Sequence, residues 1–210
     1  MSKKRLNRAQ APQVPAPRSR TGRRVVALVW IVVAGLAVAT AFVVVPRGSS
    51  GGGTPEGAPT SGPAPAFSER DVVSGQSLSN ESLRGRNVLL FFSEGVMCQA
   101  CFEQIQMLQK NWRELQRRGL VLVNITTDPP DTLRDAAQAY GVLTPLVSDE
   151  DRNMSNAYAV LGQGMHPDTA GHTFVLVDKR GRIRWRRDYS KMYVKPGELF
   201  AEIPDLASAG

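Results

Sequence analysis

The sequence predicts an α/β protein in which helices flank both faces of a mixed β-sheet, with one transmembrane helix before the sheet. Three observations predict this class. Short apolar runs typical of buried strands alternate with amphipathic segments in the middle of the 210-residue chain. A hairpin pattern and a last helical segment follow them. A run of 21 uncharged, mostly apolar residues precedes all of these elements.

The N-terminal segment, residues 1–24, carries eight Lys and Arg residues and no acidic residue. We expect it to be a disordered basic tail. Because the net charge of the whole chain is +7, the other residues sum to −1. The positive charge therefore belongs to the tail, and the rest of the chain gives no electrostatic reason to expect a nucleic-acid partner.

Residues 25–45 are the uncharged run, and as a helix they would span about 31 Å, enough to cross a hydrocarbon core of roughly 30 Å. The basic flank predicts a cytoplasmic N-terminus and an extracytoplasmic main domain. A cleaved signal peptide is the alternative, because the small residues at 37–41 are similar to a cleavage site. The apolar run continues to Val45, which favours an uncleaved, single-pass anchor in the cell membrane. Both interpretations place the main domain outside the cytoplasm.

Residues 46–66 are rich in Gly, Pro, Ser, Thr and Ala, which predicts a flexible linker. The folded domain is expected at residues 67–210. Its first strand is predicted at 87–92, a short apolar run of the buried type. Its first helix is predicted at 101–118, where apolar residues recur at three- and four-residue spacing and Gly119 marks the end.

A second buried strand is predicted at 120–127, and a second helix at 131–141 with Asp131 as its N-cap. A third helix, a hairpin and a closing helical segment complete the domain, at residues 152–162, at 173–178 with 183–189, and at 195–206. This order of strands and helices is typical of a mixed sheet with helices on both faces.

The chain has only two cysteines, Cys98 and Cys101, and they lie between the first predicted strand and the first predicted helix. Free N–H groups and the positive dipole end at a helix N-terminus stabilise a thiolate, so we expect Cys98 to be the reactive sulfur. Cys101, one turn into the helix, should be more buried. The spacing predicts a redox pair in which Cys98 is the nucleophile and Cys101 resolves a mixed disulfide.

These motifs together resemble the thioredoxin-like superfamily, in its redoxin branch of thiol-specific antioxidant (AhpC/TSA-like) proteins and thiol–disulfide oxidoreductases. The resemblance covers most of residues 66–206 and rests on three stretches, LRGRNVLLFFSEGVMCQAC, VLVNITTDPPDTL and TFVLVDKRGRIRW. They are similar to the strand and CxxC opening, the second strand with its Asp-containing turn, and the closing hairpin of that branch. The resemblance implies a thioredoxin-like sheet and a redox-active disulfide.

Two positions differ from the usual pattern of that superfamily. An aromatic residue commonly precedes the first cysteine, and here the residue is Met97. A cis-proline commonly faces the pair just before the hairpin, and here that place falls on or next to His172. We expect His172 to lie over the disulfide and to tune Cys98. Glu94 and Glu103 also flank the pair and could move a proton, although solvated charges are the simpler interpretation.

Alternative functions stay open. A purely structural disulfide is disfavoured, because closing so short a loop stabilises little. A peroxidase of the thiol-specific antioxidant branch resembles a Pro-x-x-x-Thr/Ser-x-x-Cys pattern, whereas Phe91 and Gly95 occupy its first two defined positions here. An assembly factor similar to Sco-type copper chaperones would bind Cu(I) through Cys98, Cys101 and His172. Zinc held by both cysteines and both histidines is disfavoured by their wide spacing.

We therefore predict a membrane-anchored, extracytoplasmic thiol–disulfide oxidoreductase that works through its disulfide without a bound cofactor. Its partners would be extracytoplasmic protein thiols or disulfides and an electron donor. The sequence leaves open the direction of electron flow, the client protein and the oligomeric state.

Overall fold

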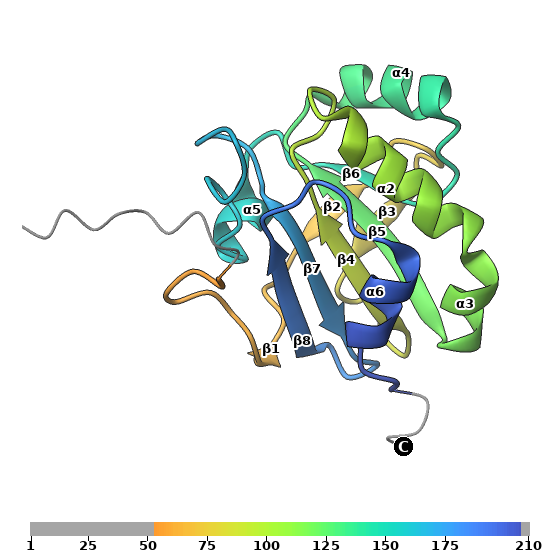
Figure 1. Ribbon diagram of the computed structural model, residues 1–210, viewed down its shortest axis with the longest axis vertical. Coiled ribbons are helices and arrows are strands. Elements are labelled where there is room, and N and C mark those ends of the chain that lie inside the picture. Colours follow the sequence, from red (N-terminus) through yellow and green to blue (C-terminus); the bar gives the residue numbers. More distant parts are fainter. Residues whose placement is uncertain (1–52, 207–210) are drawn as a thin grey trace, which may run out of the picture. The chain divides into compact units, whose positions relative to one another are not determined.

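The computed structural model describes residues 53–206. They form a six-stranded mixed sheet in the order β1-β8-β7-β4-β5-β6 (Figure 1). Its strands are β1 (Gly62–Pro63), β4 (Asn87–Phe92), β5 (Leu120–Thr126), β6 (Leu146–Ser148), β7 (His172–Val177) and β8 (Arg182–Tyr189). The helices are α2 (Gln99–Lys110), α3 (Trp112–Arg117), α4 (Pro130–Tyr140), α5 (Asn153–Ala157) and α6 (Pro196–Glu202). A separate small sheet pairs β2 (Ser68–Arg70) with β3 (Ser77–Ser79).

The cysteines follow the strand β4, which lies in the middle of the large sheet. β4 runs parallel to β5 and antiparallel to β7, and every residue of β4 is buried. A central strand with side chains buried on both faces reads as a continuous apolar run, which is why its sequence shows no alternation. The predicted strands at 87–92 and 120–127 and the predicted hairpin are confirmed.

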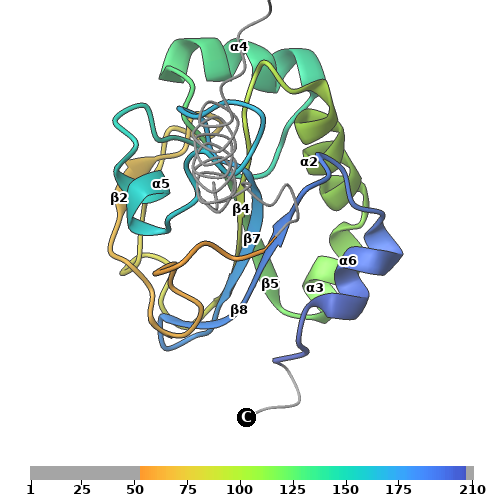
Figure 2. The ribbon, with the colours of Figure 1, turned by 60° about the vertical axis from the view of Figure 1, so that its left-hand side comes forward.

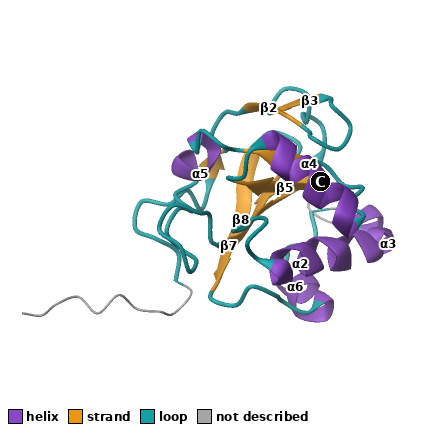
Figure 3. Ribbon diagram, turned by 90° about the horizontal axis from the view of Figure 1, so that it is seen from above, coloured by secondary structure: helices purple, strands orange, loops and turns teal. Residues whose placement is uncertain are grey.

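Helices lie on both faces of the sheet, as predicted (Figures 2 and 3). On one face, α2, α3, α4 and α6 bury a core that includes Phe102, Leu133 and Phe200. On the other face, α5 and the N-terminal segments pack over a second core that includes Phe92 and Met154. The alternation of side chains along β4 and β7 divides their residues between these two cores.

The segment predicted as one helix over 101–118 is two helices. α2 ends at Lys110, and α3 begins at Trp112. Between them, the side-chain amide of Asn111 donates a hydrogen bond to the carbonyl of Met107 at 2.8 Å. An Asn side chain that bonds a neighbouring backbone group competes with the helical pattern, and the helix breaks at this residue.

The next two helices also differ from their predicted ranges. α4 begins at Pro130 with Pro129 as its N-cap residue, and Asp131, expected as the N-cap, lies in the first turn and pairs with Arg134 at 2.6 Å. Proline suits the first turn because its missing N–H would have no helical partner there. α5 is shorter than the predicted range 152–162, because the backbone turns left-handed two residues after it.

The sheet includes residues that the sequence assigned to the linker. β1 pairs with the start of β8, and the N–H of Ala64 donates to the carbonyl of Gly181 at 2.9 Å. This pairing covers part of the free edge of β8. The folded part of the chain therefore begins before the predicted boundary at residue 67.

None of the helices that residues 53–206 form is long and apolar enough to cross a membrane. The predicted basic tail at 1–24, the predicted transmembrane helix at 25–45 and the first part of the predicted linker lie outside the described residues.

Candidate redox site

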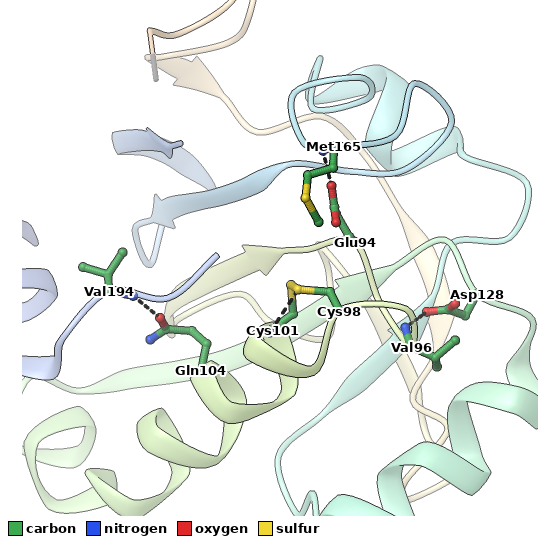
Figure 4. The surroundings of a disulfide bond; sticks show 8 residues. All are labelled: Glu94, Val96, Cys98, Cys101, Gln104, Asp128, Met165 and Val194. Atoms are coloured by element: carbon green, nitrogen blue, oxygen red, sulfur yellow. Dashed lines mark hydrogen bonds between the residues drawn. A yellow bond between two sulfur atoms is a disulfide. The ribbon is translucent and has the colours of Figure 1, made fainter. Parts of the chain in front are cut away.

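The two cysteines lie where β4 leads into α2, and they form a disulfide (Figure 4). Cys98 is the N-cap residue of α2, and its Sγ accepts a hydrogen bond from the backbone N–H of Cys101 at 3.2 Å. The buried strand fixes the chain before the pair, and the helix presents its free N–H groups to the sulfur. A thiolate released at Cys98 would therefore be stabilised where it forms.

The disulfide is almost completely buried. The exposed fraction is 5% for Cys98 and 0% for Cys101. The predicted order of exposure, with Cys98 the more accessible sulfur, is thus confirmed, but the margin is small. A partner sulfur can approach Cys98 alone, and only through close contact with the residues around it.

The turn before Cys98 depends on a glycine and on an aspartate that follows β5. Gly95 has a φ of +84°, and a Cβ there would lie 1.8 Å from Oδ2 of Asp128. The same oxygen accepts the N–H of Val96 at 3.0 Å. A threonine at position 95, as in the peroxidase pattern, would collide with this carboxylate. Asp128 was not among the predicted site residues, and its one signal in the sequence is its place in the turn after the second strand.

Glu94 is not the solvated charge that the sequence favoured. Its exposed fraction is 2%, and its carboxylate accepts the backbone N–H of Met165. Figure 4 shows the two residues joined on one side of the disulfide, with Asp128 and Val96 on another. Glu103 does remain exposed on α2, where it accepts the side-chain amide of Gln99 at 2.8 Å.

His172 is the first residue of β7 and is buried, with an exposed fraction of 1%. The next residue, Thr173, pairs with the last residue of β4, so His172 lies at the end of the sheet where the cysteine turn starts, residues 93–97 between β4 and Cys98. The centroids of its ring and of the Phe91 ring are 4.7 Å apart, and the two rings pack edge to face on the side of the sheet that α2 covers. Burial lowers the pKa of His172 to about 3, so the imidazole is neutral at physiological pH.

His172 is thus on the same face and at the same end of the sheet as the disulfide, but as a core residue. Neither ring nitrogen has a hydrogen-bond partner among the described residues. Met97, by contrast, is 81% exposed beside Cys98. Within residues 53–206, no group of three or more His, Cys, Asp or Glu side chains could hold a metal ion. The copper set of Cys98, Cys101 and His172 is therefore not assembled.

Two further buried polar side chains lie near the pair and were not found from the sequence. Ser93 follows β4, and its Oγ has no partner among the described residues. Gln104, one turn after Cys101, accepts the N–H of Val194 at 2.7 Å and so ties α2 to the segment before α6. From the sequence alone, a buried serine or glutamine looks the same as one on the surface, so neither residue could be recognised as buried.

The sequence is similar to those of known redox proteins. The sequence model of the AhpC/TSA family matches residues 61–186. Peroxiredoxin Bcp of Escherichia coli is 30% identical over 124 residues, which cover 57% of this chain and 79% of that protein. The thiol-disulfide oxidoreductase ResA of Halalkalibacterium halodurans is 26% identical over 112 residues, which cover 53% of this chain and 58% of that protein.

Among solved structures, the peroxidoxin BcpB of Mycobacterium tuberculosis superposes with a TM-score of 0.59. The match covers 69% of this chain and 96% of that one at 19% sequence identity, which shows a shared fold. The predicted mixed sheet of the thioredoxin-like kind is confirmed.

Proposed function

Because the chain belongs to the AhpC/TSA family, we propose that it is a membrane-anchored thiol–disulfide oxidoreductase whose redox domain lies outside the cytoplasm. The observation that carries the proposal is the disulfide between Cys98 and Cys101 at the N-terminus of α2. The two sulfurs are joined at the start of α2, where free backbone N–H groups favour a thiolate at Cys98 when the pair opens.

The proposed exchange begins when a partner thiolate attacks Sγ of Cys98. The bond between the two protein sulfurs breaks, and Cys101 leaves as a thiolate that takes up a proton. A second thiolate on the partner then attacks the partner's own sulfur in the mixed disulfide and releases Cys98. The partner dithiol is oxidised to a disulfide, and the protein is reduced by two electrons. The same steps in reverse reduce a partner disulfide.

Peroxide reduction is the second candidate, because one of the relatives named above is a peroxiredoxin. In that reaction the Cys98 thiolate would attack the peroxide O–O bond, leaving a sulfenic acid and releasing an alcohol or water. Cys101 would then displace water from the sulfenic acid to form the disulfide. Gly95 and Phe91 stand where the peroxidase pattern has Thr/Ser and Pro, and Asp128 fills the space of a side chain at 95. We therefore place exchange first.

The test uses the full-length protein in detergent, with hydroxyethyl disulfide as a small substrate and dithiothreitol as the reductant. We expect the wild type to catalyse exchange, Cys98→Ser to be inactive, and Cys101→Ser to accumulate a mixed disulfide. If the wild type consumes hydrogen peroxide much faster than it exchanges disulfides, peroxide reduction takes the first place instead. A wild type that does neither would contradict both functions.

The location is tested separately, in cells that express the full-length protein. A membrane-impermeant maleimide should label the reduced cysteines of intact cells after mild reduction, and Cys98→Ser/Cys101→Ser should remain unlabelled. Labelling only after the membrane is permeabilised would place the domain in the cytoplasm.

A further inference from the structure

The burial of the disulfide means that other residues decide which partners reach it. Only 5% of Cys98 is exposed, whereas Met97 is 81% and Met165 is 70% exposed. Both methionines are large apolar side chains in contact with solvent. They belong to different segments, one inside the cysteine turn and one in the loop before β7.

The two ends of the loop that carries Met165 are joined to each other. An isolated bridge between Leu161 and Ala170 and a hydrogen bond from Gly162 to Thr169 of 3.0 Å close its base. Residues 165–168 at its tip are exposed. We call residues 161–170 the methionine loop. These bonds hold the base of the loop. The position of Met165 therefore depends on the contacts that the tip makes with the rest of the domain.

Glu94 makes such a contact from inside the cysteine turn, four residues before Cys98. Its buried carboxylate accepts the N–H of Met165. A Cβ at Gly164 would lie 2.1 Å from Oε1 of Glu94, so the carboxylate rests directly against the loop backbone. Figure 4 shows Glu94 and Met165 together on the same side of the disulfide. A second bond, from Arg152 to the carbonyl of Asp168 at 3.1 Å, is exposed.

We propose that the methionine loop, held by Glu94 as a positioning residue, selects the partners of the redox pair. It does so by requiring that a partner present its cysteine on an apolar segment in contact with Met97 and Met165. This inference rests on the proposed exchange function and names the class of partner for the same site. Methionine suits such a surface, because its flexible, polarisable side chain adapts to different apolar neighbours.

The test compares two fluorogenic disulfide peptides with the reduced full-length protein. The peptides differ only in their flanking residues, Leu in one and Ser in the other. Loss of one apolar contact is worth about a factor of ten, so we expect the wild type to prefer the Leu peptide at least tenfold in kcat/KM. Met165→Ser and Glu94→Ala should each reduce this ratio to about threefold or less. Glu94→Gln keeps an acceptor oxygen and should restore it.

Gly164→Ala disturbs the contact between the loop and Glu94 from the other side, and it leaves Glu94 and both methionines in place. It should lower the peptide ratio in the wild type, because the new Cβ pushes the loop away from Glu94. In the Glu94→Ala background it should have little further effect, because the colliding group is gone. The rate with hydroxyethyl disulfide should stay within about twofold of the wild type for Gly164→Ala, since this small substrate needs no apolar contact.

An equal rate for both peptides in the wild type would overturn the proposal, as would an unchanged ratio in Met165→Ser and Glu94→Ala. If the wild type does not catalyse exchange with hydroxyethyl disulfide, that result would instead contradict the proposed function itself. The two failures are thus distinguishable in one set of measurements.

Discussion

At the residue scale, the chemistry of His172 differs from that of an exposed histidine because its ring is buried. Its ring is enclosed by Phe91 and Phe174 at the end of the sheet that carries the disulfide. Burial without a partner favours the uncharged ring, and the pKa falls to about 3 for that reason. A neutral imidazole at this end of the sheet supplies no positive charge that would stabilise a thiolate at Cys98.

This burial makes stability depend on pH. Between pH 3 and 6.5 the unfolded chain binds a proton at His172 that the folded protein does not, so stability falls as pH falls through this window. Above pH 6.5 the effect vanishes. We expect the wild type to lose about 2–3 kcal/mol more than His172→Phe between pH 7.5 and 4.5 in urea unfolding. His166→Gln, at an exposed histidine, is the control. Parallel pH profiles for wild type and His172→Phe would contradict the prediction.

Gly95 shapes the site through its backbone conformation. We expect Gly95→Ala to lower the free energy of unfolding by about 2 kcal/mol or more, because its left-handed φ and the contact with Asp128 both oppose a Cβ. In the Asp128→Ala background the same substitution should cost about 1 kcal/mol, from the backbone alone. Urea unfolding of the four proteins measures the coupling. Equal costs in both backgrounds would show that Asp128 does not crowd position 95.

At the element scale, the helix ends follow local backbone chemistry that the sequence shows only in part. Gly141 was correctly predicted as the end of α4, and it adopts a left-handed conformation with φ of +63°. Asn111, in contrast, breaks a continuous apolar pattern, because its side chain bonds Met107. A glycine that ends a helix is visible in the sequence, whereas a side-chain bond that breaks one depends on which rotamer the surroundings allow.

Two glycines allow this interpretation to be tested with the same substitution. Gly141→Ala should destabilise the protein by about 1 kcal/mol, because its Cβ would touch nothing but the left-handed backbone is strained. Gly197→Ala, inside α6 and equally free of contacts, should stabilise it by about 0.5–1 kcal/mol. Thermal and urea unfolding should shift in opposite directions. Shifts of the same sign would show that conformational preference does not dominate at these positions.

At the scale of the whole molecule, a buried ion pair within β8 forms hydrogen bonds to segments that are distant in the chain. Arg186 and Asp188 pair at 2.7 Å, and the hydroxyl of Thr173 donates to the same carboxylate at 2.8 Å. The guanidinium also donates to the carbonyls of Tyr158 and Ala159. The hairpin of β7 and β8 is thus connected to the two residues that follow α5, shortly before the methionine loop begins.

Breaking this pair should be costly. Asp188→Leu leaves the buried guanidinium without its counter-charge, so we expect a loss of about 3–5 kcal/mol in urea unfolding. Arg186→Met/Asp188→Leu removes both charges and should recover most of that loss. A double variant as unstable as Asp188→Leu would show that the hydrogen bonds to Tyr158 and Ala159, rather than the unpaired charge, dominate.

Much of the fold was predictable because its signals are local. The strands at 87–92 and 120–127, the hairpin and the position of the cysteines between strand and helix are patterns of neighbouring residues, and the structure confirms them. β1 and β6 were not predicted. They have two and three residues, and they exist because a neighbouring strand offers unpaired backbone groups.

By itself, the sequence determined the class of sheet, the place of the cysteine pair between a strand and a helix, and the order of exposure of the two sulfurs, because these follow from apolar periodicity and from the position of Cys98 at a helix start. Only the tertiary structure decided the surroundings of the pair. It buried Glu94 against the methionine loop, placed Asp128 against Gly95 and enclosed His172 in aromatic rings. Each of these contacts joins residues far apart in the chain, and no local pattern encodes which distant groups will share a buried space.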